Sequence, residues 1–114
     1  MKINKPWGNE WIWAKTDRYV GKILTIRQSH RLSYQYHNTK EETIYLMKGE
    51  MDLEYEENGV RKTLRLKEGQ NFHIPPRMKH RMIAVTHCQV VEVSTPELDD
   101  VVRLEDEYGR TKPS

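Results

Sequence analysis

The sequence predicts an all-β domain, a sandwich or barrel of short strands. Apolar residues alternate with polar ones in several short segments, and turn-forming residues separate these segments. No long amphipathic helical pattern interrupts the series. A length of 114 residues suits one domain with a single modest core. We therefore expect one domain over 1–114, strand-rich over about 7–95, with a tail at 96–114.

The N-terminal segment predicts two strands, over 7–14 and 19–27, separated by a polar turn. Trp11 and Trp13 fall on one face of the first strand. The three early tryptophans have two interpretations: a platform that stacks on a sugar, or packing over the barrel mouth or in a dimer interface. We favour packing, because large aromatic side chains contribute most there.

The middle of the chain predicts a β-meander. Asn58-Gly59 is its strongest hairpin signal, since both residues accept a positive φ. Pro75-Pro76 ends a further strand, because proline cannot continue a central ladder. The strands expected here and beyond lie between 43 and 66, at 72–74, at 80–86 and at 88–95.

Charge and composition exclude several classes of partner. With 19 basic and 17 acidic residues the net charge is +2, and no dense basic run favours nucleic acid. No apolar run approaches the roughly 20 residues of a membrane span, and residues 1–6 lack a signal-peptide core. The single Cys88 excludes an internal disulfide. These features lead us to expect a cytoplasmic protein without nucleic-acid or membrane partners.

Residues 33–80 carry the chemistry of the chain. In an extended segment, Gln35 and His37 share one face, and Glu42 follows from the next segment. His80 arrives after the turn that the two prolines impose. Two imidazoles and a carboxylate delivered by strands form a ligand set suited to a divalent metal inside a barrel.

The spacing of these residues resembles that of the cupins, which are double-sheet jelly rolls. Their second motif, G-x5-P-x-G-x2-H-x3-N, matches at Gly69, Pro75 and His80. Their first motif, G-x5-H-x-H-x3,4-E-x6-G, matches in its first histidine, its acid and its closing glycine, which are His37, Glu42 and Gly49. Thr39 stands where the second histidine of that motif belongs. The resemblance implies a single-domain cupin jelly-roll barrel.

Three further stretches resemble the cupin domain of type II mannose-6-phosphate isomerase. That domain begins with P-W-G, as residues 6–8 do, and carries R-L-S-x-Q-x-H, as residues 31–37 do. Its D-D-I-V-R-F-E-D-x-Y-G-R ending is similar to residues 99–110. Thr39 is again the departure, because the family usually has H-x-H-R-A-E-H where this chain has 37–43.

We expect His37, Glu42 and His80 to bind the metal, and Gln35 or His73 to supply a further ligand. Glu41 is the competing carboxylate if the strand register differs by one residue. Zinc, manganese, iron, cobalt and nickel all suit such a set, and the sequence does not select among them.

The resemblance implies an aldose–ketose isomerase acting on a sugar phosphate, mannose-6-phosphate being the substrate. Such a reaction needs a base, for which Glu42 and His80 are the catalytic candidates, and cations that hold the phosphate. The substrate-binding candidates are the basic residues Lys22, Arg31, Arg77, Arg103 and Arg110. Two alternatives stay open: a non-catalytic module that binds sugars or nucleotide sugars, and an iron-dependent dioxygenase.

We also expect a homodimer. A small all-β domain has edge strands to cover, and the N-terminal tryptophans offer apolar surface. The specific expectation is strand exchange of residues 7–14 with a partner sheet.

Overall fold

The computed structural model describes residues 1–111, and these form strands, turns and loops without a helix. The strands are β1 (Lys2–Lys5), β2 (Gly8–Lys15), β3 (Val20–Ile26), β4 (Tyr34–Tyr36), β5 (Glu42–Lys48), β6 (Met51–Glu57), β7 (Val60–Leu66), β8 (Asn71–Ile74), β9 (His80–Ala84), β10 (Cys88–Ser94) and β11 (Val102–Glu105). Among the described residues, therefore, no helix is long and apolar enough to cross a membrane.

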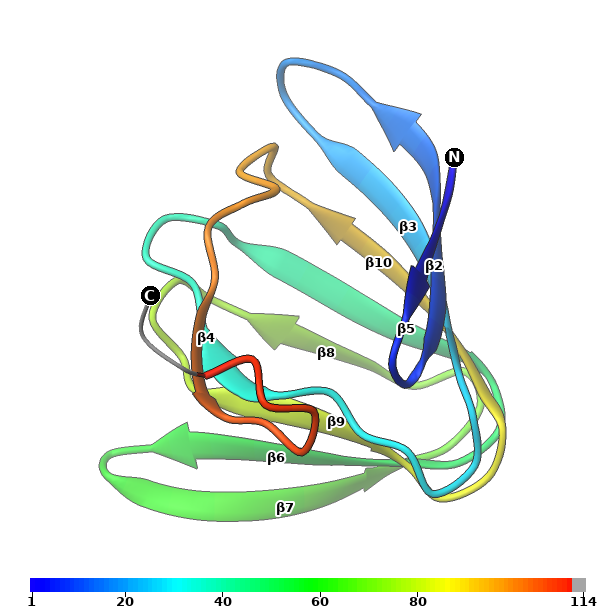
Figure 1. The fold of residues 1–114 in the computed structure, drawn as a ribbon. Helices are drawn as coiled ribbons and strands as arrows, with labels where there is room; N and C mark the ends of the chain where they lie inside the picture. Colours follow the sequence, from blue (N-terminus) through cyan, green and yellow to red (C-terminus); the bar gives the residue numbers. More distant parts are fainter. Residues whose placement is uncertain (112–114) are drawn as a thin grey trace.

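The strands form two antiparallel sheets that face each other (Figure 1). The six-stranded sheet has the order β1-β2-β3-β10-β5-β8, and the five-stranded sheet has the order β11-β4-β9-β6-β7. The chain passes from one sheet to the other several times, for example from β5 to β6 and from β9 to β10. This arrangement confirms the predicted all-β jelly roll.

The core lies between the inner faces of the two sheets. Alternate residues of β3, β5 and β10 are buried, as the period of a strand with one face on a core requires. Leu24, Ile44 and Val90 project inward from the first sheet, and Met51 and Leu53 meet them from the second. Each of these five side chains is almost completely buried.

The predicted hairpin at Asn58-Gly59 connects β6 and β7. Both residues have positive φ, 54° and 77°, which matches the right-handed twist of the two strands. Beyond β8, the two prolines lead into Arg77, whose φ is 71°. The turn there reverses the chain and places His80 at the first position of β9.

Two strands lie beyond the expected strand-rich region of 7–95. β1 precedes it and β11 lies in the tail. β1 pairs with one edge of β2, while β3 pairs with the other. Both edges of β2 are paired within the chain. An exchanged β2 would make the same pairings with a partner sheet, so the expected strand exchange through residues 7–14 stays a prediction.

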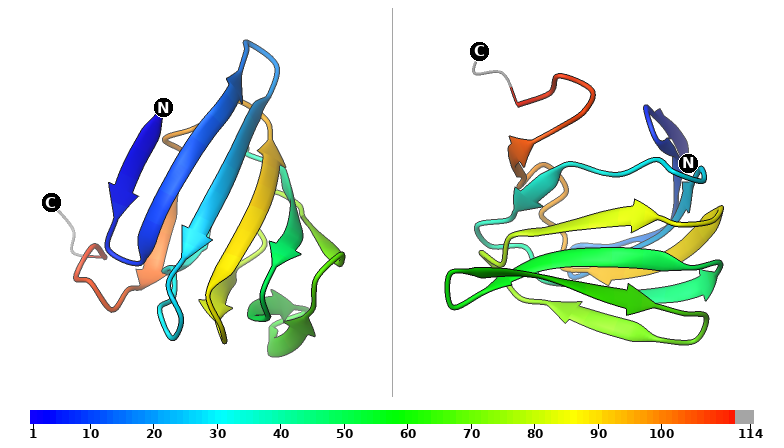
Figure 2. Two further views of the ribbon diagram at one scale, coloured as in Figure 1. Left: turned by 90° about the vertical axis from the view of Figure 1, so that its right-hand side faces the viewer. Right: turned by 90° about the horizontal axis from the view of Figure 1, so that it is seen from below.

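The tail crosses one open side of the sandwich. In Figure 1 it descends from the end of β10, in orange and red, to β4. There β11 pairs with β4, and the last described turn follows (Figure 2, right). The tail thus lies beside the space between the sheets into which His37 projects.

Candidate metal centre and its cavity

Three side chains from separate elements meet between the sheets. His37 directly follows β4, Glu42 begins β5 and His80 begins β9. All three are buried, and one ligand atom from each lies within 4.8 Å of the other two. The two imidazole rings have centroids 5.4 Å apart. The convergence that the sequence spacing predicts is therefore present in the fold.

Backbone carbonyls fix the orientation of both imidazoles. His37 donates from Nδ1 to the carbonyl of Asp100 at 2.5 Å, and His80 donates from Nδ1 to the carbonyl of Met78 at 2.9 Å. A carbonyl oxygen can only accept, so the proton of each neutral ring resides on Nδ1. The lone pair of each Nε2 consequently points toward the other members of the cluster.

The Nε2 atoms face the carboxylate of Glu42. Its Oε1 lies 3.3 Å from Nε2 of His80 and 3.7 Å from Nε2 of His37. Both Nε2 atoms are buried and have no hydrogen-bond partner among residues 1–111. Two lone pairs and an anion in one buried place need a positive charge between them. A divalent ion meets that need, so the donor set fits a metal.

The charge of Glu42 is favoured by its neighbours. Burial alone would raise the pKa of this carboxyl, but in the metal-free protein a proton on Nε2 of His37 or His80, donated to the carboxylate, and the ammonium of Lys40 outweigh burial and hold the pKa well below its usual range. Glu42 is therefore ionised at neutral pH and available as a ligand.

Lys40 is a buried cation that the sequence analysis did not single out. Its Nζ lies 3.1 Å from Oε2 of Glu42 and 3.2 Å from Oε2 of Glu92, which projects inward from β10. Burial lowers the pKa of Lys40, but the charges of Glu92 and Glu42 more than compensate and raise it above its usual value. The alternation in β10 was the signal that could have placed Glu92 inside.

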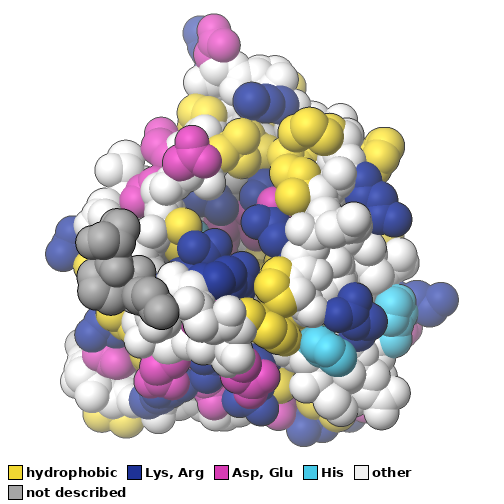
Figure 3. Space-filling view, viewed as in Figure 1, with side chains coloured by type: hydrophobic (Ala, Val, Ile, Leu, Met, Phe, Trp, Pro, Cys, Tyr) yellow, Lys and Arg dark blue, Asp and Glu magenta, His cyan; other side chains and the backbone are white. Residues whose placement is uncertain are grey.

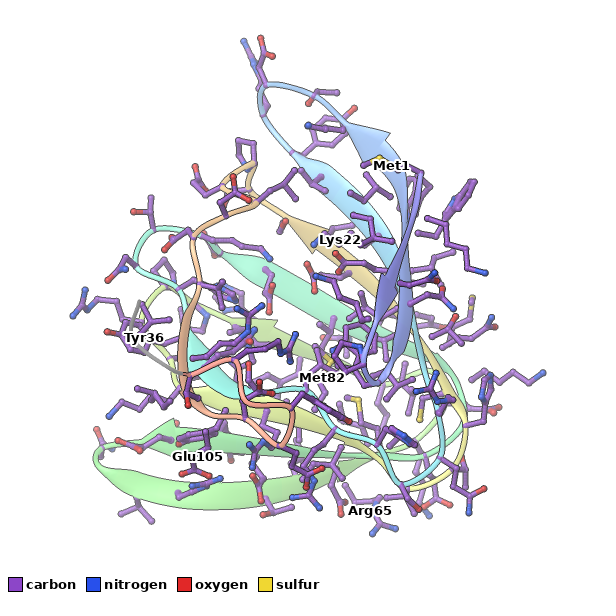
Figure 4. The ribbon with its side chains drawn as sticks, in the orientation of Figure 1. Met1, Lys22, Tyr36, Arg65, Met82 and Glu105 are labelled. Carbon is purple, nitrogen blue, oxygen red and sulfur yellow. The ribbon has the colours of Figure 1, made fainter. Side chains whose placement is uncertain are left out.

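The cluster opens into a polar cavity between the sheets. Lys22, Arg103 and Arg110 line it together with Gln35, His37 and Glu42. Figure 3 shows basic side chains in a hollow of this face, and Figure 4 shows Lys22 on β3 near the middle of the molecule. The cavity thus combines a candidate metal centre with cations able to hold an anion.

The predicted cationic residues divide into two groups. Lys22 is buried and pairs with Glu10 at 3.3 Å, and Arg110 pairs with Asp106 at 2.8 Å. Arg103 Nε is buried without a hydrogen-bond partner in the described chain, and burial followed by the charge of Arg110 lowers the pKa of Arg103. An arginine placed in this way favours the approach of an anion.

The other two predicted cations lie away from the cavity. Arg31 forms an ion pair with Glu107 at 3.0 Å. Arg77 is exposed and donates to the side chain of Asn38. A substrate-binding role for either of them stays a prediction.

The two proposals for a further ligand have different outcomes. Gln35 lines the cavity and pairs in register with His80, and its Oε1 accepts a hydrogen bond from Ser33. His73, by contrast, lies on the outer surface and contacts Glu41 at 2.6 Å. His73 as a ligand is therefore wrong, and so is the alternative carboxylate Glu41, because strand alternation directs both away from the cluster.

Thr39, at the position of the missing motif histidine, is exposed. Its backbone N–H donates to Oδ2 of Asp100, as does that of Lys40, while the N–H of Asn38 donates to Oδ1. The sequence analysis assigned no role to Asp100, although Asp100 lies in the stretch 99–110 that carries the family resemblance. Asp100 holds the loop 38–40 in place through contacts between residues 60 or more positions apart.

Comparisons with known proteins agree with this fold and site. Alginate biosynthesis protein AlgA of Pseudomonas aeruginosa is 30% identical over 115 residues, which cover 96% of this chain and 23% of AlgA. Mannose-1-phosphate guanylyltransferase ManC of Salmonella typhimurium is 31% identical, with 96% of this chain and 23% of ManC covered. The chain therefore spans about a quarter of the length of these curated relatives.

Two further comparisons extend beyond these relatives. 3-Hydroxyanthranilate 3,4-dioxygenase of Burkholderia cenocepacia is 30% identical over 99 residues, covering 83% of this chain and 54% of the dioxygenase. The solved structure of KdgF from Halomonas sp. superposes with a TM-score of 0.72 at 18% identity, covering 87% of this chain and 90% of KdgF. The latter likeness concerns the fold alone.

A family model described as Cupin domain matches residues 23–94, which include the second half of β3, all of β4 to β10 and all three residues of the cluster. These matches also confirm the resemblance to the cupin domain of type II mannose-6-phosphate isomerase. The chain belongs to the cupin family.

Proposed function

We propose that this chain is a metal-dependent aldose–ketose isomerase that acts on a sugar phosphate, with mannose-6-phosphate as its substrate. The observation that carries the proposal is the convergence of His37, Glu42 and His80 beside a cavity that Arg103 and Lys22 also line. Similarity to ManC and AlgA over nearly the whole chain supports a sugar-phosphate ligand.

The metal would be zinc, manganese, iron, cobalt or nickel, held by His37, Glu42 and His80, with Gln35 as a further oxygen ligand. When bound, such an ion polarises substrate oxygens and stabilises negative charge that develops on them. The buried, oriented Nε2 atoms of the two histidines suit this task, since their positions are already fixed by hydrogen bonds to backbone carbonyls.

The chain itself must move one proton between C1 and C2 of the sugar. We assign the base to whichever of Glu42 and His80 does not coordinate the ion; their facing atoms lie 3.3 Å apart. The base takes the proton from C2 while O1 gains a proton, which gives an enediol; the base then returns its proton to C1 while the hydroxyl at C2 loses its proton and becomes the ketone. The base is thereby regenerated at the end of each turnover.

The phosphate is assigned to the basic wall of the cavity. Arg103 has an unpartnered buried Nε, and Lys22 and Arg110 line the same cavity. Charge-assisted hydrogen bonds from such groups hold a phosphate firmly and fix the sugar relative to the cluster.

The test is an isomerase assay on the purified chain. Mannose-6-phosphate is supplied with each of the five divalent metals, and fructose-6-phosphate is measured. We expect turnover with at least one metal, abolished by EDTA and by His80→Ala but retained in His73→Ala, the exposed histidine that serves as a matched control. Absence of turnover with every metal contradicts the proposal. Thermal stabilisation by mannose-6-phosphate without turnover would identify a non-catalytic sugar-binding module instead.

A dioxygenase is the second candidate. Two histidines and one carboxylate form the ligand set of many non-haem iron oxygenases, and the dioxygenase relative is 30% identical over most of this chain. Oxygen consumption with ferrous iron and 3-hydroxyanthranilate would support this candidate. If the protein consumes no oxygen under those conditions, this second function is rejected.

A further inference from the structure

Buried charged side chains form a row across the inner face of the six-stranded sheet. The row consists of Glu42 on β5, Glu92 on β10, Lys22 on β3 and Glu10 on β2, and all four line the cavity. Each is at most 8% exposed. Apolar residues often stabilise such positions at least as well, because charges lose their hydration on burial. A buried charged row along a cavity wall therefore indicates a role in ligand binding.

Glu92 has hydrogen-bonding capacity that the fold does not use. Its Oε2 accepts a hydrogen bond from Nζ of Lys40 at 3.2 Å, and residues 1–111 form no other hydrogen bond to this carboxylate. Each oxygen of an ionised carboxylate can accept two hydrogen bonds. Glu92 therefore presents a free acceptor, its Oε1, at the wall of the cavity.

Glu92 lies between the candidate metal centre and the basic wall of the cavity. On one side, Nζ of Lys40 contacts the carboxylates of both Glu92 and Glu42, so a single ammonium separates the two acids. On the other side, Lys22 lies directly opposite Glu92 in the pairing of β10 with β3. Directly opposite residues on one face of a sheet lie about 5 Å apart at Cβ. A ligand that reaches from the metal centre to Lys22 must therefore pass Glu92.

The spacing of the strands matches the length of an open-chain sugar phosphate. Neighbouring strands lie about 4.8 Å apart, so β5 and β3, on either side of β10, are about 10 Å apart. An extended six-carbon chain with a terminal phosphate spans about 9 Å, because each bond adds roughly 1.3 Å along the chain. If C1 and C2 lie at the metal centre and the phosphate at the basic wall, the middle of the chain lies beside Glu92.

We propose that Glu92 determines specificity by accepting a hydrogen bond from the sugar hydroxyl group at C3 or C4. This inference rests on the proposed isomerase function, because the metal centre and the basic wall set the position of the sugar. A carboxylate suits this role, since hydrogen bonds to a charged group are stronger than neutral ones.

The burial of Glu92 makes it selective. A site built to bind a hydroxyl group discriminates against a ligand that lacks it, because the buried acceptor is then left without its partner. The role of Glu92 is therefore distinct from that of the metal ligands and of the base, and it concerns which sugar chain the cavity accepts.

Calorimetric titration of the purified chain with mannitol 6-phosphate tests this proposal. This ligand has the open chain and the hydroxyl groups of the sugar but no carbonyl, so it binds without reacting. Two analogues, one lacking the hydroxyl group at C3 and one lacking that at C4, are compared with it. We expect one of the two to bind the wild type at least about tenfold more weakly than mannitol 6-phosphate. This measurement does not depend on the folding of any variant.

Glu92→Gln completes a double-mutant cycle with these ligands. The substitution keeps the size of the side chain and should weaken the binding of mannitol 6-phosphate by a similar factor. It should change little for the analogue that lacks the hydroxyl group recognised by Glu92. Glu54→Gln is the matched control, because Glu54 lies on the five-stranded sheet and pairs with Arg61 at 2.9 Å. This control is expected to retain the wild-type affinity for every ligand, and circular dichroism verifies that both variants are folded.

A wild type that binds none of the three ligands, or all three equally, would overturn the proposal. So would an equal loss for every ligand in Glu92→Gln, because that pattern marks a purely structural role. The isomerase assay is a separate readout. Without turnover, a ligand-specific loss would refute the isomerase and support Glu92 as a sugar-recognition residue. With turnover, an equal loss for every ligand would refute the role of Glu92 alone.

Discussion

Asp100, a residue of the tail, binds His37 through its backbone carbonyl and binds the loop 38–40 through its side-chain carboxylate. Its carbonyl accepts the Nδ1 proton of His37 at 2.5 Å, and its carboxylate accepts backbone N–H groups of residues 38–40. One tail residue therefore sets both the tautomer of a candidate ligand and the path of the chain toward Glu42. The tail is part of the site because of this contact.

The Asp100 carboxylate makes stability depend on pH. Backbone N–H donors, Thr39 first, lower the pKa of Asp100 from 3.8 to about 2. Because the pKa is lower in the folded state, the ionised carboxylate stabilises the fold at pH values above 3.8. This stabilisation is lost as the pH falls toward about 2. In Asp100→Asn we expect a lower Tm than wild type at neutral pH and a difference that shrinks between pH 4 and pH 2.

Thermal melts across this pH range measure that difference. Asp99→Asn is the control, because Asp99 is exposed and its neutralisation should leave the Tm close to that of the wild type at each pH. A difference between Asp100→Asn and wild type that stays constant down to pH 2 would contradict the role assigned to the carboxylate.

Lys40 is expected to stabilise the metal-free protein. Lys40→Met leaves Glu42 and Glu92 buried without their shared cation, which costs about 3 kcal/mol when a buried pair is broken. Lys40→Arg keeps the positive charge, so its free energy of unfolding should fall by less than that of Lys40→Met. Urea unfolding in EDTA measures both variants, and an unchanged free energy of unfolding in Lys40→Met would show that the ion pairs contribute nothing.

Arg103 is expected to recognise the phosphate. Arg103→Gln removes a charge-assisted hydrogen bond, worth about 2 kcal/mol, and should raise KM for mannose-6-phosphate at least about tenfold. The comparison is Arg61→Gln, a surface arginine paired with Glu54 and Glu105. If both variants retain the wild-type KM, the phosphate binds elsewhere; thermal shifts with inorganic phosphate provide the same comparison without turnover.

Local signals predicted much of this fold. The strand alternation that predicted the all-β class is the pattern that buries residues such as Ile44 and Val90, since a period of two needs only neighbouring residues to be read. Asn58-Gly59 gave its hairpin because both residues accept positive φ. Motif spacing identified His37, Glu42 and His80, which the structure brings together.

The sequence did not predict contacts between residues that are far apart along the chain. The buried ammonium of Lys40 is compensated by Glu42 and by Glu92, and Glu92 projects from β10, 52 residues away. The face of His73 depended on the register between β8 and β5, where it lies opposite Thr43 on the outer side. The sequence likewise did not indicate that β1 pairs with β2 and covers one of its edges.

The central claim is that His37, Glu42 and His80 hold one divalent ion. Metal analysis of protein purified without a histidine tag tests it most directly, after dialysis and for wild type, His80→Ala and His73→Ala together. We expect about one ion per chain in the wild type and in His73→Ala, and close to none in His80→Ala. Equal metal content in all three proteins, or none in the wild type after incubation with zinc, manganese, iron, cobalt and nickel, would contradict the account.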